Sequence, residues 1–496
     1  MTAKIAKNTF FLTSAYIGQK IFSFIYFSLI ARFVGVENVG LYVTALSFSS
    51  LFSIFADLGL TQVLIREGAR EKIKIDIWLG QVIFLKIFLA VFAYVFLILI
   101  TYPLGYSGEL RFLIFLSGIL MILDSLSLAF YGVLRSLQNL FYESFGVIVG
   151  QILTIIAGVI ALVLKQPIYF LLVALGAGSF FNFIFSLTIV SRLNIKIKLI
   201  WHKDYFKKIV KLTLPFSLAG ISTKIYSYID AVLISILINT KSVGFYSIPN
   251  KVVFAFQFIP MAFAASLYPA MSHSFISNKE RLKYLFEKAV IYLSLIAFPL
   301  AFGVYVLSDV FINKVYGLTY SSSIPALKIL VFGLVFAFLD FPVGSLLNAC
   351  NRQAWQTTAM VLTMCLNIIL NLILIPIWEI KGAALAAVAS NSFLLFFGYS
   401  AVPQIVGMHK KSYWFTILKI FLSSLLMGVT VNYFKIWLIN IFTPTGFVKT
   451  LIFLGLLITF GGLFYLFLLW ITKILSKKEV DEFLSIFRKN YYEESK

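Results

Sequence analysis

The sequence predicts an all-α integral membrane protein with about fourteen transmembrane helices, forming two pseudo-twofold-related six-helix bundles plus two C-terminal helices. Composition, long apolar segments and an internal repeat lead to this fold class. Hydrophobic residues make up 61% of the 496 residues, charged residues make up only 12%, and the mean hydropathy is +0.97. Because a water-soluble domain needs about 25% charged residues, a soluble fold is excluded.

Apolar segments long enough to cross a bilayer occur along the whole chain. A spanning helix needs about 20 apolar residues. The first segment is longer than the apolar core of about 7–15 residues in a cleavable signal, so we expect it to remain as a helix. Pro215, Pro260 and Pro342 fall inside three segments and predict bends. The predicted spans are 10–34, 39–64, 79–102, 112–134, 144–164, 168–190, 212–238, 243–271, 288–312, 325–350, 355–377, 381–403, 414–440 and 448–472.

An internal repeat predicts the domain organisation. Lys-Ile-Phe-Ser-Phe-Ile at 20–25 matches Lys-Ile-Tyr-Ser-Tyr-Ile at 224–229, and the Val-Gly-x-Tyr motifs at 39–42 and 243–246 have the same offset of 204 residues. Six predicted helices separate the copies, which indicates a parallel repeat about an axis along the membrane normal. We therefore predict bundles at 1–190 and 212–403, a basic cytoplasmic linker at 191–211, two additional helices at 404–472 and a cytoplasmic tail at 473–496.

The distribution of Lys and Arg predicts the orientation. With the N-terminus inside, 27 of these residues fall in inward-facing segments and 6 in outward-facing ones. Cytoplasmic loops carry such an excess, so both termini are expected in the cytoplasm. The basic loops would meet anionic membrane lipids, which accounts for the net charge of +21 without a nucleic-acid partner.

Charged residues inside the predicted spans are the candidate functional residues, because charge at bilayer depth is costly. Lys20 and Lys224 lie near the midplane, roughly 15–18 Å from the inner ends of their helices. Two interpretations remain open. The lysines either face a central cavity and bind an anionic group, or they pair with Asp124 and Asp340, which lie at comparable depth.

Other polar residues within the spans receive separate interpretations. Lys251 lies nearer the outer side and is a further cavity candidate, whereas Asp230, like Asp124 and Asp340, is a candidate for ion pairing or ion coupling. Asp57 is interpreted as a structural residue at a helix end. Asn367 and Asn371, four residues apart on one helix face, predict hydrogen bonds across a helix–helix contact. The small residues at 382–387 predict close packing.

Several activities lack their sequence signals. No G-x-x-x-x-G-K-[ST] loop is present, so no ATP-hydrolysing site is expected. No loop exceeds about twenty residues, so we expect no soluble catalytic domain and no enzyme activity. Cys350 and Cys365 lie in apolar runs and the three histidines are scattered, so no metal or cofactor is expected.

Three segments resemble the polysaccharide biosynthesis flippases of the Wzx type, which share a superfamily with the MATE multidrug exporters and peptidoglycan-precursor flippases. They are residues 40–67, residues 243–246, and the run at 367–376 followed by 381–384. The resemblance extends over residues 5–405. The sequence departs from the family at 378–380, where members often carry a Gly in a tighter turn.

The resemblance implies a flippase in a prokaryotic plasma membrane that moves an isoprenyl-diphosphate-linked oligosaccharide by alternating access. Lysines suit the phosphates, and hydroxyl groups suit the glycan. Polysaccharide polymerases or glycosyltransferases are the implied protein partners. The alternatives are a cation-coupled exporter of the MATE type, which would favour acidic cavity residues, and a membrane enzyme. Hydroxyl candidates for the glycan are Tyr16, Tyr26, Tyr226 and Tyr228.

Overall fold

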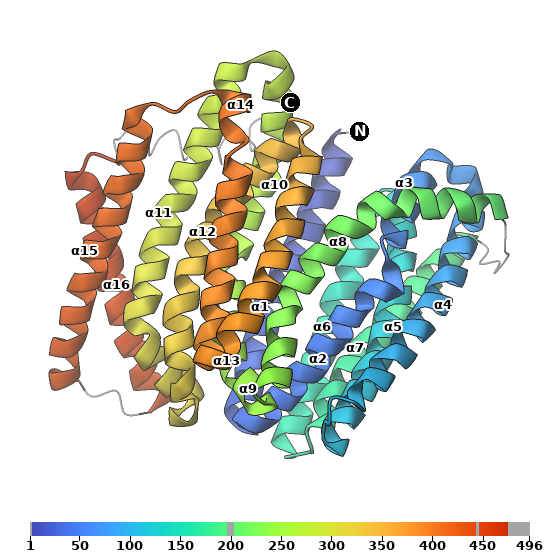
Figure 1. The fold of residues 1–496 in the computed structure, drawn as a ribbon, viewed down its shortest axis with the longest axis horizontal. Coiled ribbons are helices and arrows are strands. Elements are labelled where there is room, and N and C mark those ends of the chain that lie inside the picture. Colours follow the sequence, from blue (N-terminus) through green and yellow to red (C-terminus); the bar gives the residue numbers. More distant parts are fainter. Residues whose placement is uncertain (1, 196–202, 443–445, 475–496) are drawn as a thin grey trace. The chain divides into compact units, whose positions relative to one another are not determined.

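A computed structural model describes residues 2–195, 203–442 and 446–474, and its regular elements are all helical (Figure 1). In this part of the chain, 13 helical segments are long and apolar enough to cross a membrane. The predicted all-helical membrane fold is thus confirmed. The elements are α1 (Thr2–Val34), α2 (Val36–Asp57), α3 (Leu60–Arg70), η1 (Lys72–Lys74), α4 (Ile75–Thr101), α5 (Gly108–Ser136), α6 (Phe141–Val163), α7 (Tyr169–Arg192), α8 (Lys203–Leu237), α9 (Thr240–Phe256), α10 (Phe258–Ser277), α11 (Lys279–Phe311), η2 (Ile312–Tyr316), η3 (Leu318–Ser323), α12 (Ile324–Ala349), α13 (Gln353–Tyr399), α14 (Val402–Val406), α15 (Lys411–Ile441) and α16 (Phe447–Ile471).

The difference between 13 and the predicted fourteen lies in α13. This element passes through Glu379, whose φ of 51° and ψ of −132° are not helical. The predicted spans 355–377 and 381–403 lie on the two sides of this residue. A single sharp turn thus replaces the predicted loop, and the number fourteen stays a prediction.

Small residues let the chain fold back at this turn. A Cβ atom on Gly382 would lie 2.1 Å from the carbonyl oxygen of Leu374, so only glycine fits there. Ala383, Ala384 and Ala386 are completely buried. The predicted close packing of 382–387 is confirmed.

The predicted span 39–64 is wrong as a single helix. It divides into α2 and α3, because Leu58 and Gly59 both adopt left-handed conformations with φ values of 44° and 82°. The side chain of Asp57 accepts hydrogen bonds from the backbone N–H and the hydroxyl of Thr61, which satisfies donors at the start of α3. The predicted structural role of Asp57 at a helix end is confirmed.

The chain forms two compact units, of which the first comprises Met1–Ala255 and Met360–Ala386. In this unit α5 packs against α2, α3, α4 and α7, while α6 packs against α1 and α7. Trp78, Leu64 and Leu134 belong to its buried apolar core. These units are defined by how compactly their residues pack and not by the repeat, so the domain boundaries predicted from the repeat stay a prediction.

The repeated Val-Gly-x-Tyr motifs meet each other inside the first unit. A Cβ atom on Gly40 would lie 2.0 Å from the carbonyl oxygen of Thr240, and one on Gly244 would lie 2.1 Å from that of Val36. Glu37 and Lys241, also 204 residues apart, form an ion pair at 2.8 Å. The starts of α2 and α9 therefore make a reciprocal contact, as expected for two copies of one motif.

The second unit comprises Phe256–Ala359 and Ala387–Lys496. Within it α11 packs against α10, α12, α15 and α16, and α15 packs against α16. Lys435 of α15 is buried and forms an ion pair with Asp309 of α11 at 3.1 Å, which fixes the first additional helix to the rest of this unit.

Candidate functional site

A pocket of about 240 Å³ lies within the first unit, between residues of α1, α6 and α9. Helical spacing places its residues on one face of each helix. Gln19 and Ser23 are four residues apart on α1, and so are Lys251 and Ala255 on α9. The lining residues are Gln19, Lys20, Ser23, Phe24, Gln151, Lys251, Phe254 and Ala255.

Lys20 and Lys251 give the pocket its charge. The ammonium group of Lys20 lies 4.6 Å from the ring centre of Phe254, and that of Lys251 lies 5.3 Å from the ring centre of Phe27. Neither lysine forms an ion pair with any residue that the structure describes. Both lie within candidate spans, Ala15–Val34 and Thr240–Ser277.

Placing these two ammonium groups inside a membrane has an energetic cost. An unpaired ammonium group inside a membrane costs about 2.5–3.5 kcal/mol on insertion scales. The aromatic faces offset part of this, at about 0.5–2 kcal/mol for each contact. An anion bound between the two ammonium groups would offset the remainder, so the site is chemically suited to phosphate or carboxylate.

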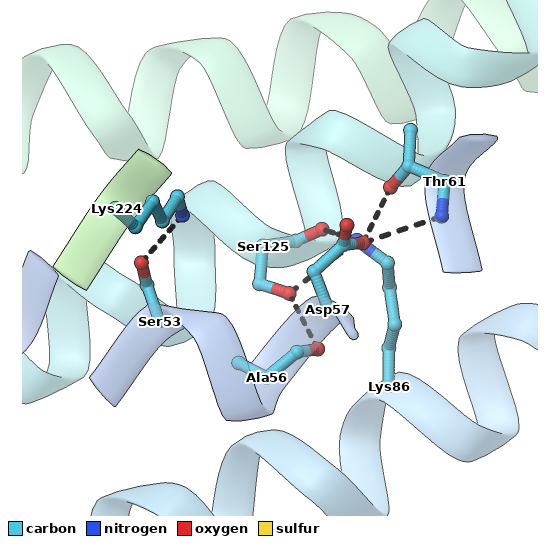
Figure 2. Close-up of polar contacts among 7 residues, drawn as sticks. All are labelled: Ser53, Ala56, Asp57, Thr61, Lys86, Ser125 and Lys224. Carbon is cyan, nitrogen blue, oxygen red and sulfur yellow. Dashed lines mark hydrogen bonds and ion pairs between the residues drawn. The ribbon is translucent and has the colours of Figure 1, made fainter. Parts of the chain in front are cut away.

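The matching lysine of the second repeat, Lys224, is placed differently. Its ammonium group donates a hydrogen bond to the hydroxyl of Ser53 at 2.7 Å, as Figure 2 shows, and it does not line the pocket. Asp57 and Asp124 are the carboxylates that act on it electrostatically. The structure therefore brings Lys20 together with Lys251, and not with Lys224.

Asp57 has a closer partner that the sequence interpretation missed. Lys86 of α4 is completely buried and forms an ion pair with Asp57 at 2.6 Å. Its ammonium group also donates to the backbone oxygen of Ser125 at 2.7 Å (Figure 2). Their depth in the membrane could have indicated this pair, since Asp57 and Lys86 each lie seven residues from the inner ends of their predicted spans, roughly 10 Å along the helix axis.

The four candidate tyrosines lie outside the pocket lining. The hydroxyl of Tyr16 donates to Glu143 at 2.8 Å and accepts from Arg135 at 3.1 Å, so it joins α1 to the α5–α6 turn. Tyr26 is buried against Gly158 of α6. On α8, Tyr226 is half-buried and Tyr228 is exposed.

The other two candidate acids lie apart from the pocket as well. Asp230 is buried and accepts hydrogen bonds from Tyr246 and Asn371, both at 2.8 Å. The bond from Asn371 joins α13 to α8, which confirms the predicted interhelical role of this amide. In the second unit, one carboxylate oxygen of Asp340 is buried and has no hydrogen-bond partner among the described residues.

Gln19 and Gln151 are pocket residues that the sequence interpretation did not identify. The predicted candidates were charged residues and tyrosines, whereas the side-chain amide of a glutamine in an apolar run carries no charge. For Gln19, its position next to Lys20 was the available clue. Gln151 lies on α6, which packs against α1, and only the tertiary structure brings it to the pocket.

This chain is similar to known sequence families, to individual proteins and to solved structures. The sequence profile of the MatE family matches residues 215–373. The probable low-salt glycan biosynthesis flippase Agl15 of Haloferax volcanii is 26% identical over 207 residues, which are 41% of this chain and 44% of that protein. The capsular polysaccharide biosynthesis protein CapF of Staphylococcus aureus is 22% identical over 415 residues, covering 81% of this chain and all of that protein (100%).

Among solved structures, the lipid II flippase MurJ in an inward closed conformation matches with a TM-score of 0.73 and 19% identity, covering 93% of this chain and 98% of that one. This likeness confirms the fold. The profile described as "Polysaccharide biosynthesis protein" matches residues 5–275, more than half of the 496 residues. The chain therefore belongs to the polysaccharide biosynthesis protein family.

Proposed function

We propose that this protein is a flippase that translocates a lipid-linked oligosaccharide across a prokaryotic plasma membrane. The observation that carries the proposal is the pair of lysines, Lys20 and Lys251, which lie on candidate membrane-spanning helices and line one pocket without a carboxylate partner among the described residues. Family membership and the similarity to Agl15 and CapF support this substrate class.

The two lysines bind the diphosphate that joins the glycan to its lipid. Lysine ammonium groups act on phosphate as point charges and tolerate several binding geometries. The lipid tail stays in the bilayer, and the polar glycan follows the diphosphate through the protein. Translocation breaks no bond, so the mechanism requires neither a nucleophile nor a general base.

A flipping assay in proteoliposomes tests the proposal. A fluorescent isoprenyl-diphosphate-linked oligosaccharide is added, and its arrival in the opposite leaflet is measured by quenching. Lys20→Ala and Lys251→Ala should each lower the rate at least tenfold, and Arg at either position should restore part of it. Lys419→Ala, which removes a lysine of α15 far along the chain from the pocket helices, serves as the control. Full transport by the Lys20→Ala/Lys251→Ala double variant would refute the proposal.

The match to the MatE profile favours export of small molecules as a second candidate function. The pocket charge weighs against cationic drugs, because two ammonium groups would repel them. Cells that express the protein should therefore gain no resistance to cationic dyes or drugs. Resistance that depends on Asp230 or Asp340 would instead support the exporter.

The proposed orientation has both termini in the cytoplasm. Because transport moves the substrate across the membrane, partners such as glycosyltransferases or polysaccharide polymerases would supply it on one face and receive it on the other. In a variant with Cys350 and Cys365 replaced by Ser, a single cysteine at Ser495 should resist a membrane-impermeant maleimide in intact cells. A cysteine at Gln166, in a predicted outer loop, should react. The reverse pattern would overturn the orientation.

A further inference from the structure

The pocket contains uncharged polar groups beside its two lysines. Gln19 and Ser23 come from α1, and Gln151 comes from α6. None of these three side chains has a hydrogen-bond partner among the described residues. They are therefore available to a ligand.

These groups suit a different part of a ligand from the part that the lysines suit. A side-chain amide presents two N–H donors and one carbonyl acceptor, and a hydroxyl can donate and accept. A phosphate at neutral pH chiefly accepts, so the acceptor oxygens of Gln19 and Gln151 have no use against it. Sugar hydroxyl and acetamido groups both donate and accept, and they match this set.

The pocket volume limits how much of the glycan can enter. Sites for drug-sized ligands measure about 300–1,000 Å³, whereas this pocket measures about 240 Å³. The pocket is therefore too small to enclose an oligosaccharide of several sugars. The sugar bonded to the diphosphate is the one held within reach when the lysines bind the phosphates.

We propose that Gln19 and Gln151 bind the sugar directly attached to the diphosphate, and that they make this sugar the one the transporter selects. The inference rests on the proposed function of the same pocket. Sugars further along the glycan make no contact here, so their identity has little effect on transport. Each lost hydrogen bond should lower recognition roughly 2- to 10-fold.

Three fluorescent probes in proteoliposomes test the inference: an isoprenyl diphosphate without sugar, one carrying N-acetylglucosamine, and one carrying glucose. The variants are Gln19→Met and Gln151→Met, because methionine keeps the length of glutamine and removes its polar atoms. Gln166→Met, outside the pocket, is the control. The flipping rate and the apparent KM of each probe are measured at matched protein yield.

Both pocket variants should lower transport of the sugar-bearing probes at least twofold relative to the probe without sugar. Gln151→Asn, which keeps an amide but shortens it, should change the ratio between the N-acetylglucosamine and glucose probes. Equal loss for all three probes, or unchanged ratios in both Met variants, would overturn the inference. Failure of the wild-type protein to flip any probe would overturn the proposed function instead.

Discussion

Removal of Lys86 should destabilise the protein strongly unless Asp57 is removed with it. The side chain of Lys86 is 0% exposed and that of Asp57 is 20% exposed, and their charged atoms lie 2.6 Å apart. Breaking a buried ion pair by removing one partner costs about 3–5 kcal/mol, because the other charge remains buried. Replacing both partners is often nearly neutral.

The surroundings of Lys86 and Asp57 predict which single substitution destabilises the protein more. Lys86→Met leaves Asp57 with two hydrogen bonds from Thr61 and with partial exposure, so its cost should fall near the lower end of this range. Asp57→Asn leaves a fully buried ammonium group with uncharged acceptors alone, which are the oxygens of Ser125 and of the new amide, so its cost should be larger. The double variant Lys86→Met/Asp57→Asn should lose no more stability than Lys86→Met alone.

Reversible unfolding in mixed micelles with increasing dodecyl sulfate measures these differences. Lys419→Met is the matched control. Lys419 forms no ion pair with a described residue; it donates to the carbonyl of Thr472 at 3.2 Å and lies 5.0 Å from the ring centre of Phe415, so its loss should change stability by about 1 kcal/mol or less. A double variant whose loss equals the sum of the two single losses would show that the residues do not act as a pair.

Three further predictions concern the backbone turns and the reciprocal contact. Glu379→Gly should raise the free energy of unfolding by about 1 kcal/mol or more, because φ is 51° there, whereas Glu379→Ala, which keeps a Cβ atom, should not. Gly40→Ala and Gly244→Ala should each cost about 1–3 kcal/mol or more, since their Cβ atoms would overlap carbonyl oxygens. Gly18→Ala, with nothing within 4 Å, is their control, and equal yields for all three variants would contradict the contact. Glu37→Gln should change stability by less than about 1 kcal/mol, because the side chains of Glu37 and Lys241 are 71% and 51% exposed; a loss as large as that of Asp57→Asn would contradict this reasoning.

The sequence predicted the helices well and their interruptions poorly, for a physical reason. Long apolar runs report burial in lipid, which is the dominant free energy for each span. A break such as Leu58–Gly59 hardly lowers the mean hydropathy of a segment of span length, so hydropathy does not reveal it. The bend predicted at Pro260 is an exception, because the sequence does reveal this interruption. Proline has no N–H to donate to the carbonyl of Phe256, four residues earlier, and α9 ends at Phe256.

The sequence predicted only part of the candidate site, because it gives the depth of a side chain in the membrane but not the direction in which that side chain points. The rise per residue gives the depth of a side chain in the membrane. The face of the helix on which it lies, and the helix opposite, depend on tertiary packing. Lys20 and Lys251 were both identified as charges within spans, but their meeting in one pocket was not. Lys86 was missed although its depth matched that of Asp57.

Lys20 and Lys224 show that a repeat can carry a residue into two environments. They occupy matching positions, yet Lys20 lines a pocket without a described carboxylate partner, and Lys224 donates to Ser53 beside Asp57 and Asp124. Equal function for the two lysines would predict equal losses on substitution. The structure instead predicts that Lys20→Gln lowers flipping of a lipid-linked oligosaccharide at least tenfold, because an uncharged amide cannot replace an ammonium group against a diphosphate. Lys224→Gln keeps a donor for Ser53 and should lower it less than threefold at equal protein yield. A tenfold loss in Lys224→Gln, with Ser53→Ala remaining active, would place Lys224 among the residues that bind the substrate.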